Sequence, residues 1–161
     1  MSNQAPCSST AKRRVKYFSK IAKIPQLSAE ERERLATVTD QYAFRVNDYY
    51  LGLINWEDPD DPIRRLVIPQ ERELTDWGQL DASNEGAVTV AKAVQHKYAS
   101  TVLLLVTEVC ASYCRYCFRK RLFMHDNAEA IHDTTAIAEG IRYIRDNPQV
   151  NNVLLTGGDP T

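Results

Sequence analysis

The sequence TVLLLVT at residues 101–107, followed closely by CASYCRYC at residues 110–117, decides how this chain is organised. Short, continuously apolar runs with β-branched residues are typical of strands covered on both faces. The second stretch holds three of the four cysteines, spaced C-x3-C-x2-C. We therefore expect a buried strand that ends in a loop of thiols.

The three thiols of that loop, Cys110, Cys114 and Cys117, indicate a soft-metal site. Thiolates select zinc, copper(I) or iron–sulfur clusters over hard cations. A [4Fe–4S] cube has four irons, so three cysteines leave one iron without a protein ligand. Such an open corner can bind and activate a small molecule, whereas a cluster with four cysteines is closed and suits electron transfer.

A second apolar run at residues 152–156 extends the pattern to a βαβ unit. Between the two runs, Asp133 is a candidate N-cap, and Ile137, Ile141 and Ile144 recur on one face of the helix that would follow it. Strand, loop, helix and strand in this order predict two parallel strands joined by a right-handed crossover. Sites in such folds lie at the C-terminal ends of the strands, which is where the cysteine loop falls.

Gly157, Gly158 and Asp159 close the second run and occupy the corresponding end of that strand. Because glycine has no Cβ, the backbone at Gly157 and Gly158 could approach a ligand closely. Asp159 adds a carboxylate suited to an ammonium group. An ordinary turn is the alternative interpretation of the three residues. Their place one strand away from the cysteine loop favours ligand binding.

Length and composition restrict the class of protein. The chain has 161 residues, 43% hydrophobic and 25% charged, as in a soluble globular protein of one ordinary domain. A net charge of −1 gives no argument for binding nucleic acid or a membrane surface. No apolar run approaches the roughly eighteen residues of a membrane helix. The clustered cysteines, with Cys7 as an incidental free thiol, favour reduced ligands in a cytoplasm over a secreted disulfide framework.

Residues 1–100 are expected to form a mainly helical lead-in, and residues 101–161 a separate region. Ser28-Ala29-Glu30-Glu31 is a capping box that begins a helix reaching about Thr39. The other expected elements are a helix over residues 47–55, a turn over residues 58–62, an extended arm over residues 64–69 and a short helix over residues 71–77.

Several stretches resemble the lysine 2,3-aminomutase family of radical S-adenosylmethionine enzymes. They are DPDDPIR at 58–64, HKY at 96–98, CRYCFRKR at 114–121 and LLTGGDP at 154–160. The cysteine spacing alone resembles the superfamily, while the basic run after it and the LLTGGD form resemble the family. The resemblance implies an α/β fold in which residues 101–161 begin an incomplete partial (β/α) barrel.

The resemblance also implies a role for each matching residue. Cys110, Cys114 and Cys117 would ligate three irons of a [4Fe–4S] cluster, and the methionine part of S-adenosylmethionine would chelate the fourth. The segment 157–159 would hold the amino group of that cofactor. No catalytic side chain is assigned within the chain.

Arg119 matches an arginine that pairs with the substrate carboxylate, a role that suits its bidentate fork. Lys97 and Tyr98 match positions that contact the phosphate of pyridoxal phosphate. Thr101 departs from the family pattern, in which an arginine is usual. The expected partners are therefore an amino acid substrate, the two organic cofactors, and an electron donor such as flavodoxin or ferredoxin.

The implied reaction moves an amino group between adjacent carbons of an amino acid. The reduced cluster cleaves S-adenosylmethionine, and the resulting radical abstracts a hydrogen from a substrate bound to pyridoxal phosphate. The cofactors carry this chemistry while the protein orients them. Lysine, glutamate and other amino acids all stay open as substrates.

Two alternatives belong to other classes of protein. A structural zinc site could combine the three cysteines with His96, His125 or His132. The chain could also be an inactive truncated fragment, because the lysine that holds pyridoxal phosphate in the family lies in a part that this sequence lacks. Two parallel strands cannot close a barrel, and open strand edges invite aggregation. We therefore expect no turnover from the 161-residue chain alone.

Overall fold

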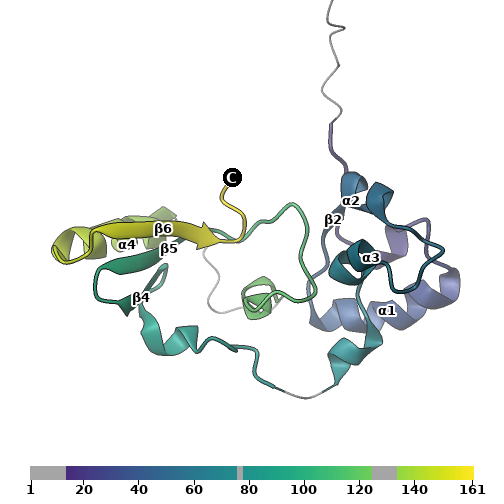
Figure 1. The fold of residues 1–161 in the computed structure, drawn as a ribbon, viewed down its shortest axis with the longest axis horizontal. Helices are drawn as coiled ribbons and strands as arrows, with labels where there is room; N and C mark the ends of the chain where they lie inside the picture. The colour runs from purple at the N-terminus through teal and green to yellow at the C-terminus, as the bar shows by residue number, and fades with distance from the viewer. Residues whose placement is uncertain (1–13, 76–77, 125–133) are drawn as a thin grey trace, which may run out of the picture.

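The computed structural model describes residues 14–75, 78–124 and 134–161 as a mixed α/β chain. The helices of the N-terminal region gather at one end of the molecule, and a four-stranded sheet with its helix lies at the other (Figure 1). The cysteine loop runs between them. Cys7, His125, His132 and Asp133 lie outside the described residues. Within the described ranges, every helix is too short or too polar to cross a membrane.

Helix α1 (Ala29–Gln41) begins at the predicted capping box. The Ser28 hydroxyl accepts the Glu31 amide at 3.1 Å, and the Glu31 carboxylate accepts the Ser28 amide at 2.8 Å. These two bonds satisfy amides that the first helical turn leaves unpaired. Leu35 and Val38 face inward, so the prediction for this helix is confirmed.

A small antiparallel ribbon joins α1 to the rest of the N-terminal region. Strand β1 (Tyr17–Phe18) pairs with β2 (Val46–Asn47), and the 3-10 turn η1 (Ile21–Lys23) follows β1. Helix α2 (Asp48–Leu53) starts directly after β2, where the Asn47 side chain accepts the Tyr50 amide at 2.9 Å. The buried side chains of this region form a core of their own: Ile21, Ile24, Leu27, Leu35, Phe44, Val46, Leu51, Ile54, Val67 and Ile68.

Helix α3 (Pro62–Val67) replaces the extended arm that was predicted over residues 64–69, so that prediction was wrong. Asp61 caps the helix by accepting the Arg64 amide at 2.7 Å, and Pro62 occupies the first turn, where its fixed φ favours a helix. The predicted helix over residues 71–77 is the shorter 3-10 turn η2 (Glu71–Leu74) within the described residues.

Four strands form the second region, in the order β3 (Thr89–Ala91), β4 (Val94–Tyr98), β5 (Thr101–Thr107) and β6 (Asn152–Gly157). Strands β3, β4 and β5 pair antiparallel, whereas β5 and β6 pair parallel. The 3-10 turn η3 (Glu85–Val88) leads into β3. The sequence patterns predicted β5 and β6 but not β3 and β4, so the sheet begins before residue 101.

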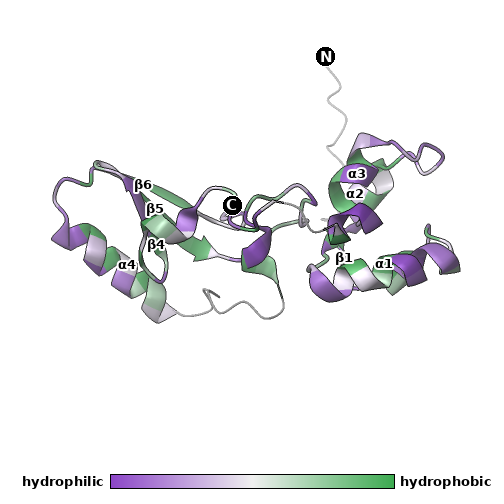
Figure 2. Ribbon diagram, turned by 90° about the horizontal axis from the view of Figure 1, so that it is seen from below, coloured by the Kyte–Doolittle hydropathy of each residue, from purple (hydrophilic) through white to green (hydrophobic). Residues whose placement is uncertain are grey.

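Helix α4 (Thr134–Asp146) joins β5 to β6, which confirms the predicted βαβ unit and its parallel strands. It lies along one face of the sheet (Figure 2). The approach is close, because a Cβ added at Gly140 would stand 2.5 Å from Leu104 Cδ1. The core between helix and sheet contains Ala93, Val94, Val102, Leu104, Leu105, Leu122 and Ala136.

Strand β6 has large apolar side chains exposed on both of its faces. Val153, Leu154 and Leu155 are 38%, 50% and 58% exposed, although all three are large and apolar. Cover on both faces was expected for residues 101–107, where Val102, Leu104 and Leu105 are buried, whereas β6 is largely exposed within the described part of the chain. Among the described residues, β6 is an edge strand that pairs with β5.

Candidate functional site

The cysteine loop leaves the C-terminal end of β5 and ends at the 3-10 turn η4 (Lys120–Phe123). Cys110, Cys114 and Cys117 are free thiols, with Cys114 exposed and the other two half-buried. Burial raises the pKa of Cys110, and the two neighbouring thiols raise it further, while the backbone of Asp159 lowers it. Burial likewise raises the pKa of Cys117. The three sulfur atoms are thus near enough to influence one another electrostatically.

The geometry of the loop bears on which metal group it fits. In the described part of the chain, no three His, Cys, Asp or Glu side chains converge closely enough for one metal ion. His96 is engaged elsewhere, since its Nδ1 lies 2.7 Å from the Tyr143 hydroxyl and its Nε2 lies 3.3 Å from the Ala99 carbonyl oxygen. A four-iron cluster takes each thiolate on a different iron, so it suits thiols spread along one loop. Among the described residues, His96 therefore does not complete a zinc site with the three cysteines.

Arg45, just before strand β2, and Asn47, at its end, hold the first half of the loop. Arg45 Nε donates to the Cys110 carbonyl at 3.0 Å, and the Arg45 carbonyl accepts the Tyr113 amide at 2.9 Å and the Ser112 hydroxyl at 3.0 Å. Asn47 Nδ2 donates to the Ala111 carbonyl at 3.3 Å. The N-terminal region thus fixes the path of the chain between the first two cysteines.

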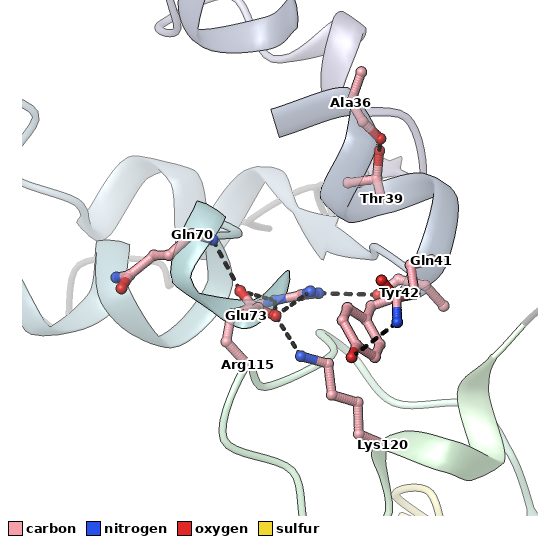
Figure 3. Close-up of polar contacts among 9 residues, drawn as sticks. Ala36, Thr39, Gln41, Tyr42, Gln70, Glu73, Arg115 and Lys120 are labelled. Carbon is pink, nitrogen blue, oxygen red and sulfur yellow. Dashed lines mark hydrogen bonds and ion pairs between the residues drawn. The ribbon is translucent and has the colours of Figure 1, made fainter. Parts of the chain in front are cut away.

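Arg115 holds the second half of the loop, between Cys114 and Cys117. Its Nε and Nη2 donate to the Glu73 carboxylate at 3.0 and 2.7 Å, and its Nη1 donates to the Ala43 carbonyl at 2.9 Å (Figure 3). Lys120 Nζ donates to the same carboxylate. We call Glu73, Arg115 and Lys120 the Glu73 triad. The triad joins η2 to Arg115 and Lys120, which lie on either side of Cys117 in the sequence.

The Glu73 carboxylate is held ionised by its partners. Burial raises its pKa, but the hydrogen bonds and charge of Arg115, together with Lys120, outweigh burial and leave the pKa below the ordinary value. Burial lowers the pKa of Lys120, and Glu73 opposes that change. Of the two shifts, the lowered pKa of Glu73 is the better supported, because two cations face one carboxylate.

This lowered pKa predicts an acid-dependent loss of stability. The unfolded chain binds a proton at Glu73 more readily than the folded chain, so the free energy of unfolding should fall as the pH drops below the ordinary Glu pKa of about 4.3. Urea unfolding of the chain and of Glu73→Gln across this range measures the effect. The variant should show a shallower dependence on pH. Equal slopes would contradict the prediction.

Gly157, Gly158 and Asp159 lie against the start of the cysteine loop. The Gly158 amide donates to the Thr107 carbonyl at 2.6 Å, and the Asp159 amide donates to the Val109 carbonyl at 2.9 Å. The φ of Gly157 is +112°, and a Cβ there would fall well inside contact distance of the Thr107 oxygen. Close packing against the neighbouring backbone therefore explains both glycines, in addition to their predicted role in binding a ligand.

Asp159 comes close to Cys110, as the positions of the two motifs predicted. Its backbone lies beside the Cys110 thiol, and its carboxylate accepts the Thr161 hydroxyl at 2.7 Å. Those hydrogen bonds to Thr161 lower the pKa of the Asp159 carboxyl. An ionised, exposed carboxylate therefore stands next to the thiol loop.

The remaining predicted residues meet in a different place. A cavity of about 330 Å³ is lined by Lys97, Tyr98, Thr101 and Arg119, together with the apolar side chains of Leu103 and Leu154 from the sheet. The structure therefore brings together the residues that the resemblance connects with pyridoxal phosphate and with the substrate. Their roles stay predictions.

Arg119 is buried and already engaged within the chain. Its Nε donates to Glu85 at 2.8 Å, and its Nη1 donates to the Thr156 hydroxyl at 2.7 Å, one residue before Gly157. Arg121 donates to the other oxygen of Glu85 at 2.9 Å. Glu85 thus occupies part of the fork that was expected to bind a substrate carboxylate, and Arg119 itself links the cavity to the end of β6. The sequence patterns did not single out Glu85.

Comparison with known proteins identifies related sequences, although no family model matches the chain. It is 54% identical to a provisionally named L-lysine 2,3-aminomutase of Aquifex aeolicus, over 92% of this chain and 39% of that protein. It is 36% identical to an L-lysine 2,3-aminomutase of Acetoanaerobium sticklandii, over 91% of this chain and 35% of that protein. A glutamate 2,3-aminomutase of Clostridioides difficile is 36% identical over 91% of this chain and 34% of its own length.

Proposed function

We propose that this chain, a relative of the lysine 2,3-aminomutases over 92% of its length, forms the cluster-binding part of a radical S-adenosylmethionine aminomutase. The observation that carries the proposal is the position of the thiol loop. The loop leaves the C-terminal end of β5. At the end of the parallel strand β6, the amides of Gly158 and Asp159 donate to the carbonyls of Thr107 and Val109, just before the first cysteine of the loop. The chain spans about 39% of the Aquifex relative, so the reaction below is proposed for the whole protein.

In this proposal Cys110, Cys114 and Cys117 hold the cluster. When it is bound together with S-adenosylmethionine, the cluster supplies the electron that cleaves this cofactor to a radical. Asp159 attracts the ammonium group of the cofactor through its ionised carboxylate, and Gly157 and Gly158 allow the end of β6 to pack closely against the backbone before the thiol loop. The clamps from Arg45 and Glu73 keep the loop in one path before the cluster arrives.

The substrate side of the proposal rests on the 330 Å³ cavity. Lys97 offers a cation for the phosphate of pyridoxal phosphate, although Thr101 stands where the family pattern has an arginine. Arg119 orients the substrate carboxylate through the part of its fork that Glu85 does not use. The substrate class is an amino acid whose amino group moves to the adjacent carbon, with lysine and glutamate both represented among the relatives' names.

We also propose that the sheet belongs to a partial (β/α) barrel, with β5, α4 and β6 as its first unit. The exposed aliphatic side chains of β6 support this arrangement, because parallel strands are normally covered on both faces. In a reducing cytoplasm the three thiols would stay available as ligands.

Anaerobic reconstitution tests the proposed function. The chain, supplied with iron and sulfide, should acquire about four irons and a reduced-state EPR signal that changes when S-adenosylmethionine is added. Cys114→Ala should abolish this uptake, because two thiolates cannot hold the cube securely. Cys7→Ala is the matched control and should leave uptake unchanged. Zinc binding in place of the cluster, or an EPR signal indifferent to S-adenosylmethionine, would overturn the proposal.

A further inference from the structure

A second and larger cavity lies on the side of the cysteine loop that faces the N-terminal region. It measures about 610 Å³ and shares no lining residue with the 330 Å³ cavity. Tyr42, Arg72 and Leu80 line it from the residues before the sheet, and Arg115, Tyr116 and Lys120 line it from the loop. The thiol loop is therefore approached by two separate concave surfaces, only one of which has a role in the proposed function.

This second cavity is strongly basic. Its lining contains four cations, Arg65, Arg72, Arg115 and Lys120, and one carboxylate, Glu73, in a chain whose net charge is −1. Glu73 is shared by Arg115 and Lys120. Arg65 pairs only loosely with Asp60, a carboxylate outside the cavity, at 3.8 Å. A concave surface lined by one sign of charge focuses its field and speeds the approach of a partner of opposite charge.

The cavity is also lined by residues that lie between two of the thiols in the sequence. Arg115 and Tyr116 stand between Cys114 and Cys117 in the sequence, and the Tyr116 ring is 62% exposed at the cavity. Cys114 is itself exposed. A protein seated here would touch the segment that carries two of the three ligands. Exposed Tyr and Arg side chains are also the residue types most enriched where proteins contact one another.

We propose that this basic cavity docks an acidic one-electron carrier protein of the flavodoxin kind, which reduces the cluster through the Cys114–Cys117 side of the loop. The inference rests on the proposed function, which requires a reduced cluster. One electron passes from the reduced carrier to the oxidised cluster, and no bond of this chain forms or breaks. Weak, salt-sensitive contact over less than about 1,200 Å² is typical of such encounters. The substrate cavity stays free while the carrier is bound.

Two charge-reversal variants distinguish docking at the cavity from a general effect of the chain's net charge. The double variant Arg65→Glu with Arg72→Glu alters the cavity, and neither side chain contacts the thiol loop through a hydrogen bond in the described residues. Arg142→Glu with Arg145→Glu makes the same change of net charge on exposed positions of α4. Both double variants should unfold at the same urea concentration as the unaltered chain.

The rate of cluster reduction by photoreduced flavodoxin, measured by stopped flow on the reconstituted chain, should fall about tenfold or more in the cavity variant. It should stay unchanged in the α4 variant. Reduction by photoreduced deazariboflavin, a small uncharged donor, should proceed equally in all three chains. High salt should slow flavodoxin in the unaltered chain and have little effect in the cavity variant.

A binding measurement supplies a readout independent of the cluster. Calorimetric titration of the chain with oxidised flavodoxin should show affinity that the cavity variant loses and the α4 variant keeps. Equal flavodoxin rates in both double variants would overturn the inference, as would equal slowing by the small donor, which indicates an altered cluster. If the cluster reconstitutes normally but flavodoxin neither binds the chain nor reduces the cluster, the docking site is contradicted and the proposed function is not. Failure to assemble any cluster contradicts the proposed function as well.

Discussion

Replacing Glu73 with alanine should lower the free energy of unfolding by about 3–5 kcal/mol, because it leaves buried cations without their counter-charge. The side chains of Glu73 and Arg115 are only 11% and 4% exposed, and their pairing is bidentate. Arg115 would keep its bond to the Ala43 carbonyl but lose both bonds to a carboxylate. Lys120, which lies over the Tyr42 ring, would lose the same partner.

Urea unfolding followed by circular dichroism measures this loss. Glu71→Ala is the matched control, since Glu71 belongs to the same turn and is exposed, and it should change stability by less than about 0.5 kcal/mol. Removing Glu73 and Arg115 together should cost less than the sum of the two single changes, because the second removes the charge that the first leaves unpaired. A Glu73→Ala chain as stable as the control variant would show that the triad contributes little.

The same substitution should also affect the cluster. The Glu73 triad fixes residues on both sides of Cys117, so its loss should let that thiol move relative to Cys110, which Arg45 holds independently. We therefore expect the Glu73→Ala chain to take up iron but to lose it faster to a chelator. The Glu71→Ala chain should retain its iron like the unaltered protein.

Local signals account for what the sequence predicted well. The capping box of α1 involves residues three apart, and the isoleucine spacing predicted helix α4, although Ile141 is exposed and the buried residues of the helix are Ala136 and Gly140. The apolar runs of β5 and β6 are continuous and end in glycine or polar residues. In each case the information lies within one element, so neighbouring residues suffice to predict it.

Contacts between distant residues account for what the sequence did not predict. Arg45 and Cys110 are 65 positions apart, and Glu73 and Arg115 are 42 apart. Glu73 differs locally from the exposed Glu71 by accepting the Gln70 amide in a capping box, but only the fold brings Arg115 to it. Strands β3 and β4 were missed for a related reason. They are short and mix polar with apolar residues, and they are stabilised by strand pairing, β4 with β5 and β3 with β4.

Arg119 shows how the two kinds of information combine. The family resemblance singled it out as a partner for a substrate carboxylate, and the structure places it in a cavity with Lys97 and Tyr98. The structure adds Glu85, which lies 34 positions away and holds the guanidinium in place. A residue's chemistry could thus be predicted from a motif, whereas the residue that orients it could not.

Substituting Gly157 with alanine should destabilise the end of β6 by about 3 kcal/mol or more. The φ of +112° is a conformation that L-residues rarely adopt, and it costs about 1–3 kcal/mol for a residue with a Cβ. The added methyl group would also collide with the Thr107 carbonyl oxygen, which belongs to the backbone and cannot rotate away. The strand end must therefore shift, and the bond from the Gly158 amide to Thr107 should break.

That shift predicts a specific loss at the thiol loop, because the backbone of Asp159 would move away from Cys110. Hydrogen exchange at the Gly158 amide should accelerate, and the EPR signal of the reconstituted cluster should respond less to S-adenosylmethionine. Gly52→Ala is the matched control. Nothing lies within 4 Å of a Cβ at Gly52, which is in α2, so alanine should leave stability unchanged or raise it by up to about 1 kcal/mol. If Gly157→Ala kept both the protection of Gly158 and the response to S-adenosylmethionine, the close pairing of the two strand ends would not be what positions Asp159 beside the thiols.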